Sequence, residues 1–472
     1  MGIDVDLSME KDLAKLSYDE APRIISDFLP GPKSQELIAA EMEVETVTRV
    51  IPNVMNTVWE EAKGATVKDP DENIYIDLTA GIAVNNIGHC HPRVLETIYR
   101  ESKKMMHNPD ATNPNRVKLG QKLQQLAPGE LKGRAKMAYG LSGSSAVEIA
   151  TKFARSVSGK SHIVAFEGAY HGALGTTLGL TTSQQFRSNY GPFNQNVYHV
   201  GPYAYCYRCP LKLEYPGCDL ECAKYVEHQL LSPSSGIDLD RVAALIVEPV
   251  QGEGGYVPPP DGFLQALKKT CEKAGILYID DEVQAGMGRT GKMFAIEHYG
   301  VTPDMITLGK ALGGDLPFSA IVMADSVADN LTPMSHILTA VGNATSSAVA
   351  CTNIDILQEG LLERTAAMGS YAISVLKDMM DEIEVIGDVR GKGFMIAVEM
   401  VRNRETKEPF DLGEMMQTLL ALRDKGVLML PCGRHTNVFR LMPPLVITKK
   451  HLDRSLEIIR GVFKEVQKDV LG

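Results

Sequence analysis

A single lysine stands in a glycine-rich segment that could carry out covalent chemistry. Lys310 lies in the segment LGKALGG (308–314), directly after the apolar run 305–308. A lysine amine in an apolar setting can have a lowered pKa and form a Schiff base with an aldehyde. Most lysines are solvated surface groups, so this segment alone leaves both interpretations open.

Acidic side chains follow two other apolar runs. The run 275–279 leads directly into Asp280, Asp281 and Glu282, and Glu248 follows the run 242–247. The carboxyl ends of parallel strands are where α/β proteins bind ligands, and a carboxylate buried there requires a cationic partner. A protonated ring nitrogen or a metal ion would provide one. A solvated turn at the end of a strand is the simpler alternative.

The segment 142–144, Ser-Gly-Ser, could bind phosphate. It precedes apolar residues spaced by three and four over 146–157, and Gly159 follows, so the pattern predicts a helix that begins at the small residues. Backbone N–H groups and the positive helix end would hold an anion at Gly143 and Ser144. A simple N-terminal cap explains the same residues equally well.

Two other residues could contact a flat, charged ligand. Tyr170, in the sequence Tyr-His-Gly, could place its ring against a planar group, although tyrosines at such positions more often belong to the core. Arg440 stands in the apolar segment FRLMPP (439–444), which suggests a buried carboxylate or a ligand as its partner.

Four of the eight cysteines are close together in the sequence, at Cys206, Cys209, Cys218 and Cys222. Their spacing, C-x2-C and C-x3-C separated by eight residues, fits a structural thiolate metal site. It also fits disulfides, which occur in the cytosol of hyperthermophiles, or a loop with reduced thiols. All three interpretations give the cluster a structural role.

The expected elements would bring these residues together. Strand-like runs at 162–166, 242–247, 275–279, 305–308 and 318–323 alternate with helical patterns, which predicts a mainly parallel sheet covered by helices. The chain is helical again from about 335 to 376, strand-like at 394–400 and 427–430, and helical at 449–467. We therefore expect an N-terminal arm and part of a small domain in 1–80, a large domain in 81–334, and a C-terminal α+β domain in 335–472.

Composition narrows the class of protein. The 472 residues carry 48 basic and 59 acidic side chains, a net charge of −11, and 44% of the residues are hydrophobic. This ordinary globular composition excludes fibrous and wholly disordered chains. Basic residues form no long run, so we expect no nucleic-acid partner. No apolar stretch approaches the roughly 18 residues of a membrane span, and the N-terminus is acidic, so we expect a cytoplasmic protein that acts on a small molecule.

In this chain order, the phosphate site, aromatic ring, strand-end acid and isolated lysine are what a pyridoxal 5′-phosphate (PLP) site requires. The sequence resembles the class III aminotransferases, fold-type I PLP enzymes that include ornithine, acetylornithine and 4-aminobutyrate aminotransferases and some amino-acid racemases. The resemblance covers about residues 50–465. It rests on the segments AGIAV (80–84), GHCHP (88–92), SGS (142–144), YHG (170–172), EPVQGEGG (248–255), DEVQAGMGRTG (281–291), GKALGG (309–314), Thr339 with Gly342-Asn343, VRGKG (389–393) and RLMPP (440–444).

The resemblance implies an α/β fold with a large, mainly parallel sheet of the seven-stranded type and a smaller α+β domain. It implies that Lys310 forms a Schiff base with PLP and moves the substrate Cα proton, and that Asp281 keeps the pyridine nitrogen protonated. The other implied contacts are the phosphate with Gly143, Ser144 and a partner subunit's Thr339, the ring with Tyr170 and Val283, and the ring hydroxyl with Gln284. A homodimer or a larger homo-oligomer follows from the shared site.

Glu248 and Arg440 resemble the family's switch pair, in which the carboxylate masks the arginine from the substrate's α-carboxylate. The sequence departs from the family pattern at Ala173, where many ω-aminotransferases have an arginine that binds a carboxylate. Ser145 and the pair Ala340-Val341 also differ from the residues that are common there. Amino transfer between an amino acid or ω-amine and a 2-oxo acid is the primary expectation, and the departures leave an amino-acid racemase or epimerase as the alternative.

Overall fold

The computed structural model describes residues 7–46, 54–109, 111–188, 190–191 and 196–471. The chain forms two compact units, which we call the large unit (Arg93–Leu362) and the small unit (Met1–Pro92 with Glu363–Gly472). The boundaries expected from the sequence lie earlier in the chain, at 80/81 and 334/335. The later boundary differs because helix α13 (Ala344–Ile356) packs against α6 (Pro114–Leu126) of the large unit.

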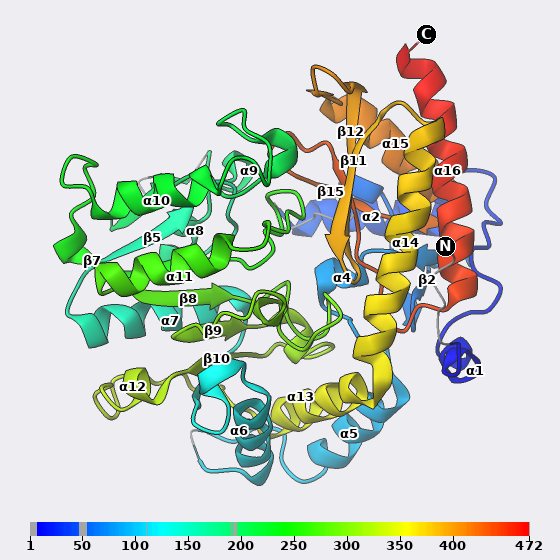
Figure 1. The fold of residues 1–472 in the computed structure, drawn as a ribbon. Helices are drawn as coiled ribbons and strands as arrows, with labels where there is room; N and C mark the ends of the chain where they lie inside the picture. Colours follow the sequence, from blue (N-terminus) through cyan, green and yellow to red (C-terminus); the bar gives the residue numbers. More distant parts are fainter. Residues whose placement is uncertain (1–6, 47–53, 110, 189, 192–195, 472) are drawn as a thin grey trace. The chain divides into compact units, whose positions relative to one another are not determined.

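The large unit contains a seven-stranded sheet with the order β4-β10-β9-β8-β7-β5-β6 (Figure 1). The run from β9 to β6 is parallel, and β10 is antiparallel to both of its neighbours. This confirms the expected mainly parallel sheet. The strands are β4 (Lys136–Gly140), β5 (His162–Phe166), β6 (Val197–Val200), β7 (Val242–Val247), β8 (Leu277–Asp281), β9 (Met305–Leu308) and β10 (Ser319–Met323).

Helices cover both faces of this sheet. Alternate strand residues such as Ile163 and Ala165 pack with the apolar side of α7 (Gly143–Ser158) in one buried core. Phe166 points the opposite way and contacts Phe263 of α11 (Phe263–Ala274). The other helices are α5 (Pro92–Ser102), α8 (Gly175–Leu180), α9 (Gln184–Arg187), α10 (Glu221–Leu231) and α12 (Asp325–Ala328).

The small unit contains two sheets. One has the order β1-β2-β3-β14, and the other has the order β11-β12-β16-β15 with β13 beside β12. The strands are β1 (Glu61–Lys63), β2 (Thr66–Lys68), β3 (Ile74–Asp77), β11 (Ile386–Lys392), β12 (Met395–Asn403), β13 (Glu408–Pro409), β14 (Val427–Leu428), β15 (Leu430–Cys432) and β16 (Val438–Leu441).

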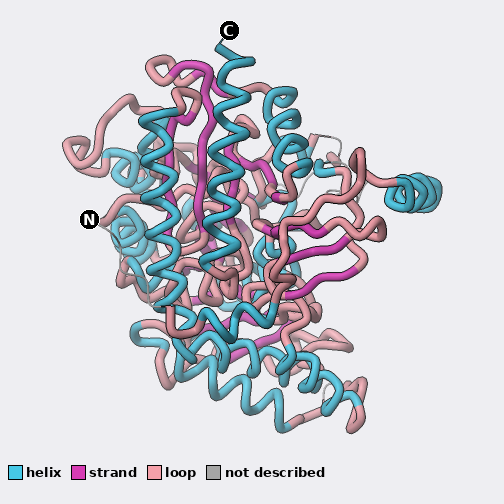
Figure 2. The backbone as a smooth tube through the Cα atoms, turned by 90° about the vertical axis from the view of Figure 1, so that its right-hand side faces the viewer, coloured by secondary structure: helices cyan, strands magenta, loops and turns pink. Residues whose placement is uncertain are grey.

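Two long helices of the small unit, α14 (Leu362–Glu382) and α16 (Lys449–Leu471), run side by side (Figures 1 and 2). Tyr371 donates a hydrogen bond to Asp453 across them at 2.7 Å, and Arg460 of α16 pairs with Glu382 of α14 at 3.1 Å. Its remaining helices are α1 (Glu10–Leu13), α2 (Pro32–Val44), α15 (Leu412–Asp424) and α4 (Ala80–Ala83), a turn with left-handed backbone.

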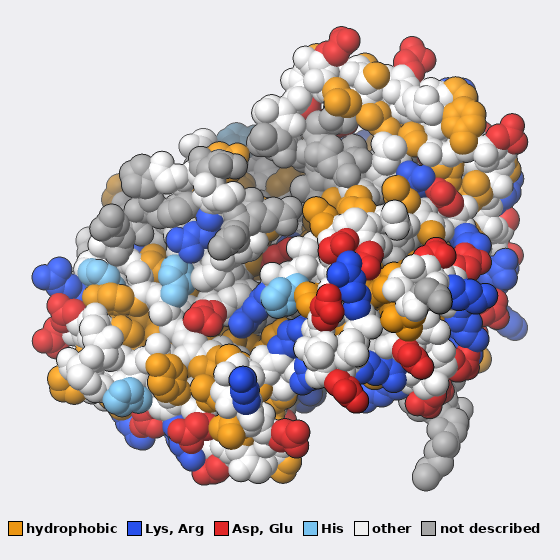
Figure 3. Space-filling view, turned by 90° about the horizontal axis from the view of Figure 1, so that it is seen from above, with side chains coloured by type: hydrophobic (Ala, Val, Ile, Leu, Met, Phe, Trp, Pro, Cys, Tyr) orange, Lys and Arg blue, Asp and Glu red, His pale blue; other side chains and the backbone are white. Residues whose placement is uncertain are grey.

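On the face shown in Figure 3, basic and acidic side chains are interspersed. Among the helices of the described residues, none has the length and apolar character that a membrane crossing requires.

Candidate active site

Three predicted site residues lie at the same edge of the large sheet. Glu248 follows β7, Asp281 ends β8, and Lys310 follows β9, and these strands are parallel neighbours. The carboxyl ends of parallel strands meet at one edge, so residues far apart in the sequence are brought together there. Glu248 and Asp281 are 6% and 4% exposed, so both acids are removed from water.

The amino-terminal end of α7 lies beside the same edge. The Ser142 side chain accepts a hydrogen bond from the Ser145 backbone N–H at 3.2 Å, and the Ser145 hydroxyl accepts from the Ser142 N–H at 2.9 Å. The capping interpretation of Ser142 is therefore confirmed. It is compatible with anion binding, because Gly143 and Ser144 form the first turn of a 16-residue helix, where backbone N–H groups lack helical acceptors.

Glycines allow the backbones of this region to approach closely. A Cβ atom on Gly309 would lie 3.1 Å from the Gly143 Cα, and a Cβ on Gly143 would lie 2.5 Å from a Val283 methyl carbon. On Gly172, whose φ is +125°, a Cβ would lie 2.4 Å from the Ser144 hydroxyl oxygen. The first turn of α7 therefore contacts the residue before Lys310, the Val283 side chain and the loop that carries Tyr170.

The Asp281 carboxylate is held by three donors. His171 Nδ1 lies 2.6 Å from one oxygen, and the Thr307 hydroxyl and the Val283 backbone N–H donate to the other at 2.9 and 3.1 Å. Although burial alone lowers the pKa of His171, the hydrogen bond to Asp281 and the charges of Asp281 and Glu248 raise it overall.

His171 and Thr307 had no role in the sequence interpretation. Thr307 pairs in register with Asp281 on the neighbouring parallel strand, and it is the one polar residue of β9. A hydroxyl in an otherwise apolar strand was the available signal. His171 lies beside Tyr170, but the sequence does not show that its imidazole reaches a residue 110 positions later.

Glu248 is held by backbone donors. The N–H groups of Tyr170 and Gly252 donate to its two oxygens at 2.9 and 2.8 Å. Burial and the charge of Asp281 outweigh these bonds and the His171 charge, and together they raise the pKa of Glu248 to about 7. Gln284 lies next to it, since a Cβ on Gly252 would contact both side chains. The buried Gln284 side-chain oxygen has no hydrogen-bond partner among the residues that the structure describes.

The remaining predicted residues have the following positions. Lys310 is partly buried and has a left-handed backbone (φ 42°), which is unusual for a residue other than glycine and is common at functional sites. Tyr170 is partly buried, and its ring contacts Phe186. Thr339 is exposed in the single chain. Arg440 is a buried residue of β16 in the small unit, in register with Ala397 of β12.

The four clustered cysteines line a cavity of the large unit, together with residues that directly follow β6. None of the eight cysteines, all of which are described, takes part in a disulfide. Among the described residues, no group of three or more His, Cys, Asp or Glu side chains is arranged to hold a metal ion.

Known proteins show the same architecture. Residues 49–463 match the family model described as "Aminotransferase class-III". The chain belongs to the class III aminotransferase family. It is 36% identical to the leucine/methionine racemase of Thermococcus litoralis, over 91% of this chain and 96% of that one. It is 34% identical to the 4-aminobutyrate aminotransferase of Mycobacterium bovis, over 95% and 100%.

Solved structures agree with this assignment. A PLP-bound amine transaminase from an uncultivated Pseudomonas species superimposes with a TM-score of 0.82 at 26% identity, covering 89% of this chain and 98% of that one. The expected fold-type I architecture is therefore confirmed. As a class III aminotransferase, the protein is a PLP-dependent enzyme.

The site of this class III aminotransferase fits the cofactor. A helix amino terminus and a buried carboxylate with three donors lie at one edge of the sheet, where they can receive an anionic phosphate and a cationic ring nitrogen. The unsatisfied Gln284 oxygen provides an acceptor for a hydroxyl group. When bound, PLP supplies an electrophilic carbonyl and an electron sink for the substrate carbanion.

Proposed function

We propose that the enzyme moves an amino group between an amino acid or ω-amine and a 2-oxo acid, with Lys310 as the covalently reacting residue. The observation that carries the proposal is the position of Glu248, Asp281 and Lys310 after three neighbouring parallel strands, beside the first turn of α7. Their relative positions match what PLP chemistry requires of its protein groups.

Each side chain then has a distinct task. The Lys310 amine would hold the cofactor through its carbonyl group, and it would take the substrate Cα proton and return it elsewhere. Asp281, held in place by its hydrogen-bond donors, would pair with the ring nitrogen and keep it protonated. Gly143 and Ser144 bind the phosphate, Tyr170 and Val283 flank the ring, and Gln284 accepts from the ring hydroxyl.

Substrate binding would involve Glu248 and Arg440. The charged Glu248 carboxylate would mask the Arg440 guanidinium, and protonation of the carboxylate would release the guanidinium to clamp an α-carboxylate. Support comes from the pKa of Glu248, which burial raises to about 7, so its charge changes within the physiological range.

The assembly is proposed to be a homodimer or a larger homo-oligomer in the cytoplasm. Thr339 is exposed in the single chain and would reach the phosphate of a partner subunit. The apolar side chains of Leu95, Tyr99 and Met106 on and after α5 are also exposed, as expected for a surface that a second copy covers.

Racemisation is the second candidate, for two reasons. The relatives include a racemase with a higher identity than the 4-aminobutyrate aminotransferase, 36% against 34%. Ala173 offers no guanidinium for a second substrate carboxylate. A racemase returns the proton to the opposite face of Cα, whereas an aminotransferase delivers it to the cofactor and requires a 2-oxo acid to complete the cycle.

Incubation of the holoenzyme with L-amino acids and ω-amines in deuterated water, with and without 2-oxoglutarate, distinguishes these reactions. We expect formation of the oxo product and glutamate only when 2-oxoglutarate is present. Loss of optical rotation with deuterium at Cα and no dependence on the oxo acid would establish racemisation instead. Lys310→Ala is the control for both reactions, and it should show neither product nor the visible absorbance of the lysine-bound cofactor.

A further inference from the structure

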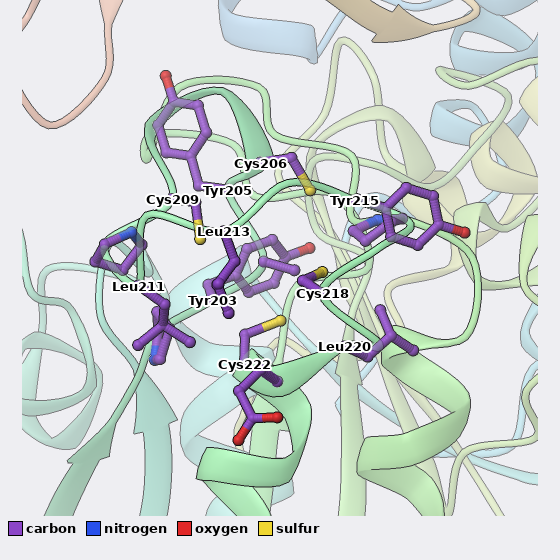
Figure 4. A pocket seen from close by; sticks show the side chains of 15 residues that line it. Tyr203, Tyr205, Cys206, Cys209, Leu211, Leu213, Tyr215, Cys218, Leu220 and Cys222 are labelled. Carbon is purple, nitrogen blue, oxygen red and sulfur yellow. The ribbon is translucent and has the colours of Figure 1, made fainter.

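None of the roles that we propose for the class III reaction involves the four cysteines of the segment 201–222. This segment follows β6, contains a 3-10 turn at Cys206–Arg208, and ends in the first turn of α10, to which Cys222 belongs. Cys206, Cys209, Cys218 and Cys222 nevertheless line one small cavity. Figure 4 shows their sulfur atoms around this cavity, above the amino-terminal turn of α10.

The four thiols lie in the wall of the same cavity, and Cys222 belongs to the first turn of α10 (Glu221–Leu231). The rest of the cavity wall is mainly apolar or aromatic, including Tyr203, Tyr205 and Leu220. Thiols are weak hydrogen-bond donors and find few acceptors in such a wall. As thiolates, the four cysteines would supply the four ligands that a tetrahedral metal site requires.

The backbone of the loop also requires a constraint. Lys212, Asp219 and Leu220 all have positive φ values, of 56°, 45° and 54°. Such conformations are strained in residues other than glycine, and they persist where the surrounding structure enforces them. Helices and strands that could enforce them are absent between Cys209 and Leu220.

The loop supports the active site. The Tyr203 hydroxyl donates hydrogen bonds to the backbone carbonyls of Glu248 and Pro249 at 3.1 and 3.4 Å. Tyr203 is fully buried and lies only three residues before the first clustered cysteine. Cross-linking the loop would therefore stabilise the chain segment that carries Glu248.

We propose that Cys206, Cys209, Cys218 and Cys222 bind one structural zinc ion as thiolates, and that this ion fixes the loop behind Glu248. Zinc accepts four thiolates in short paired spacings, and its charge removes the thiol protons despite the burial of the site. The side chains as they stand are not arranged around an ion. Binding therefore includes rotation of the four cysteine side chains toward the centre of the cavity, which the partial exposure of Cys209, Cys218 and Cys222 permits.

Metal content of the holoenzyme, produced in zinc-supplemented medium, tests the proposal directly. We expect about one zinc per chain, released when a mercurial reagent titrates the thiols. The double variant Cys218→Ser/Cys222→Ser should lose the zinc, and Cys271→Ser, a buried cysteine outside the cavity, should retain it. Absence of zinc from the wild-type protein, iron in its place, disulfides within the cluster, or zinc that persists in the double variant would each overturn the proposal.

Trypsin provides a second readout that does not depend on activity or on the folding of a variant. Arg208 and Lys212 are cleavage sites within the loop. In the zinc-loaded holoenzyme these bonds should resist trypsin, and chelation should increase their cleavage at least about tenfold while the rest of the chain stays intact. Equal cleavage before and after metal removal would contradict a role of the ion in fixing the loop.

Discussion

His171 Nδ1 lies 2.6 Å from an Asp281 oxygen, and both side chains are buried. The imidazole thereby helps to fix the position of the carboxylate, although 110 positions separate the two residues. The Thr307 hydroxyl does the same from the adjacent strand. The acid that we propose as the partner of the ring nitrogen is thus supported by two side chains that belong to other strands and loops.

Replacing His171 should weaken catalysis without abolishing cofactor binding. His171→Leu removes a donor to a charged group, an interaction worth about 1.5–3 kcal/mol, so we expect kcat/KM to fall about 10- to 100-fold. The part of the pH profile that depends on His171 should disappear, because the pKa of this imidazole is raised, against the effect of burial, by the hydrogen bond to Asp281 and by the charges of Asp281 and Glu248. His171→Asn should recover part of the rate but not this pH dependence. An unchanged pH profile would show that His171 acts only through packing.

Asp281→Asn should leave the cofactor bound but slow the reaction. The amide keeps the size of the side chain but cannot hold a proton on the ring nitrogen, so we expect retained PLP absorbance and loss of most of the rate, about 10²-fold or more. Single-turnover absorbance measurements would locate the loss in the proton-transfer step. A variant with nearly normal rates would contradict the proposed role of Asp281.

Glu248 should make stability depend on pH near neutrality. Burial and the Asp281 charge raise its pKa from 4.5 to about 7, so between these values the folded state keeps a proton that the unfolded state releases. Stability from this group is therefore present at low pH and is lost as pH rises toward and through 7. Glu248→Gln should reduce the fall in unfolding temperature between pH 5 and 8 by about 2–4 °C. Glu130→Gln, at an exposed carboxyl, should leave the fall unchanged.

Gly309→Ala should damage the cofactor site through contact with α7. The added methyl would lie 3.1 Å from the Gly143 Cα, and neither backbone can yield without displacing Lys310 or the first turn of the helix. Overpacking of about 1–3 kcal/mol would raise the dissociation constant of PLP about tenfold or more, measurable by fluorescence titration.

A matched glycine provides the control for that variant. Gly461 lies on the exposed side of α16, with no atom within 4 Å of an added Cβ. Gly461→Ala should leave PLP affinity unchanged and stabilise the protein by up to about 1 kcal/mol, as expected for alanine in a helix. Equal PLP affinities in the two alanine variants would refute the close contact at Gly309.

Ala173→Arg should change the choice of substrate. An introduced guanidinium can bind a second carboxylate with charge-assisted bonds, so kcat/KM for donors with a distal carboxylate should rise about tenfold relative to neutral amines. Ala173→Gln, which has similar length but no charge, should not change this ratio. The same gain with glutamine would show that side-chain size, not charge, determines the effect.

Many of the elements could be predicted from the sequence because their patterns are local. The runs 162–166, 242–247 and 305–308 form strands with the expected limits, and α7 begins at Gly143 and is followed by Gly159. Strand β8 ends two residues later than expected, so Asp280 and Asp281 belong to the strand itself. Apolar runs and helix caps depend on neighbouring residues, which a sequence displays directly.

By itself, the sequence determined which residues have the chemistry for PLP: an isolated lysine, a strand-end acid and a small-residue turn at a helix start. Only the tertiary structure decided which residues support them. The contacts of His171 with Asp281, of Tyr203 with the Glu248 carbonyl and of Gly309 with Gly143 join distant parts of the chain. Such contacts depend on strand order and register, which arise when the whole sheet packs and leave no local signal in the sequence.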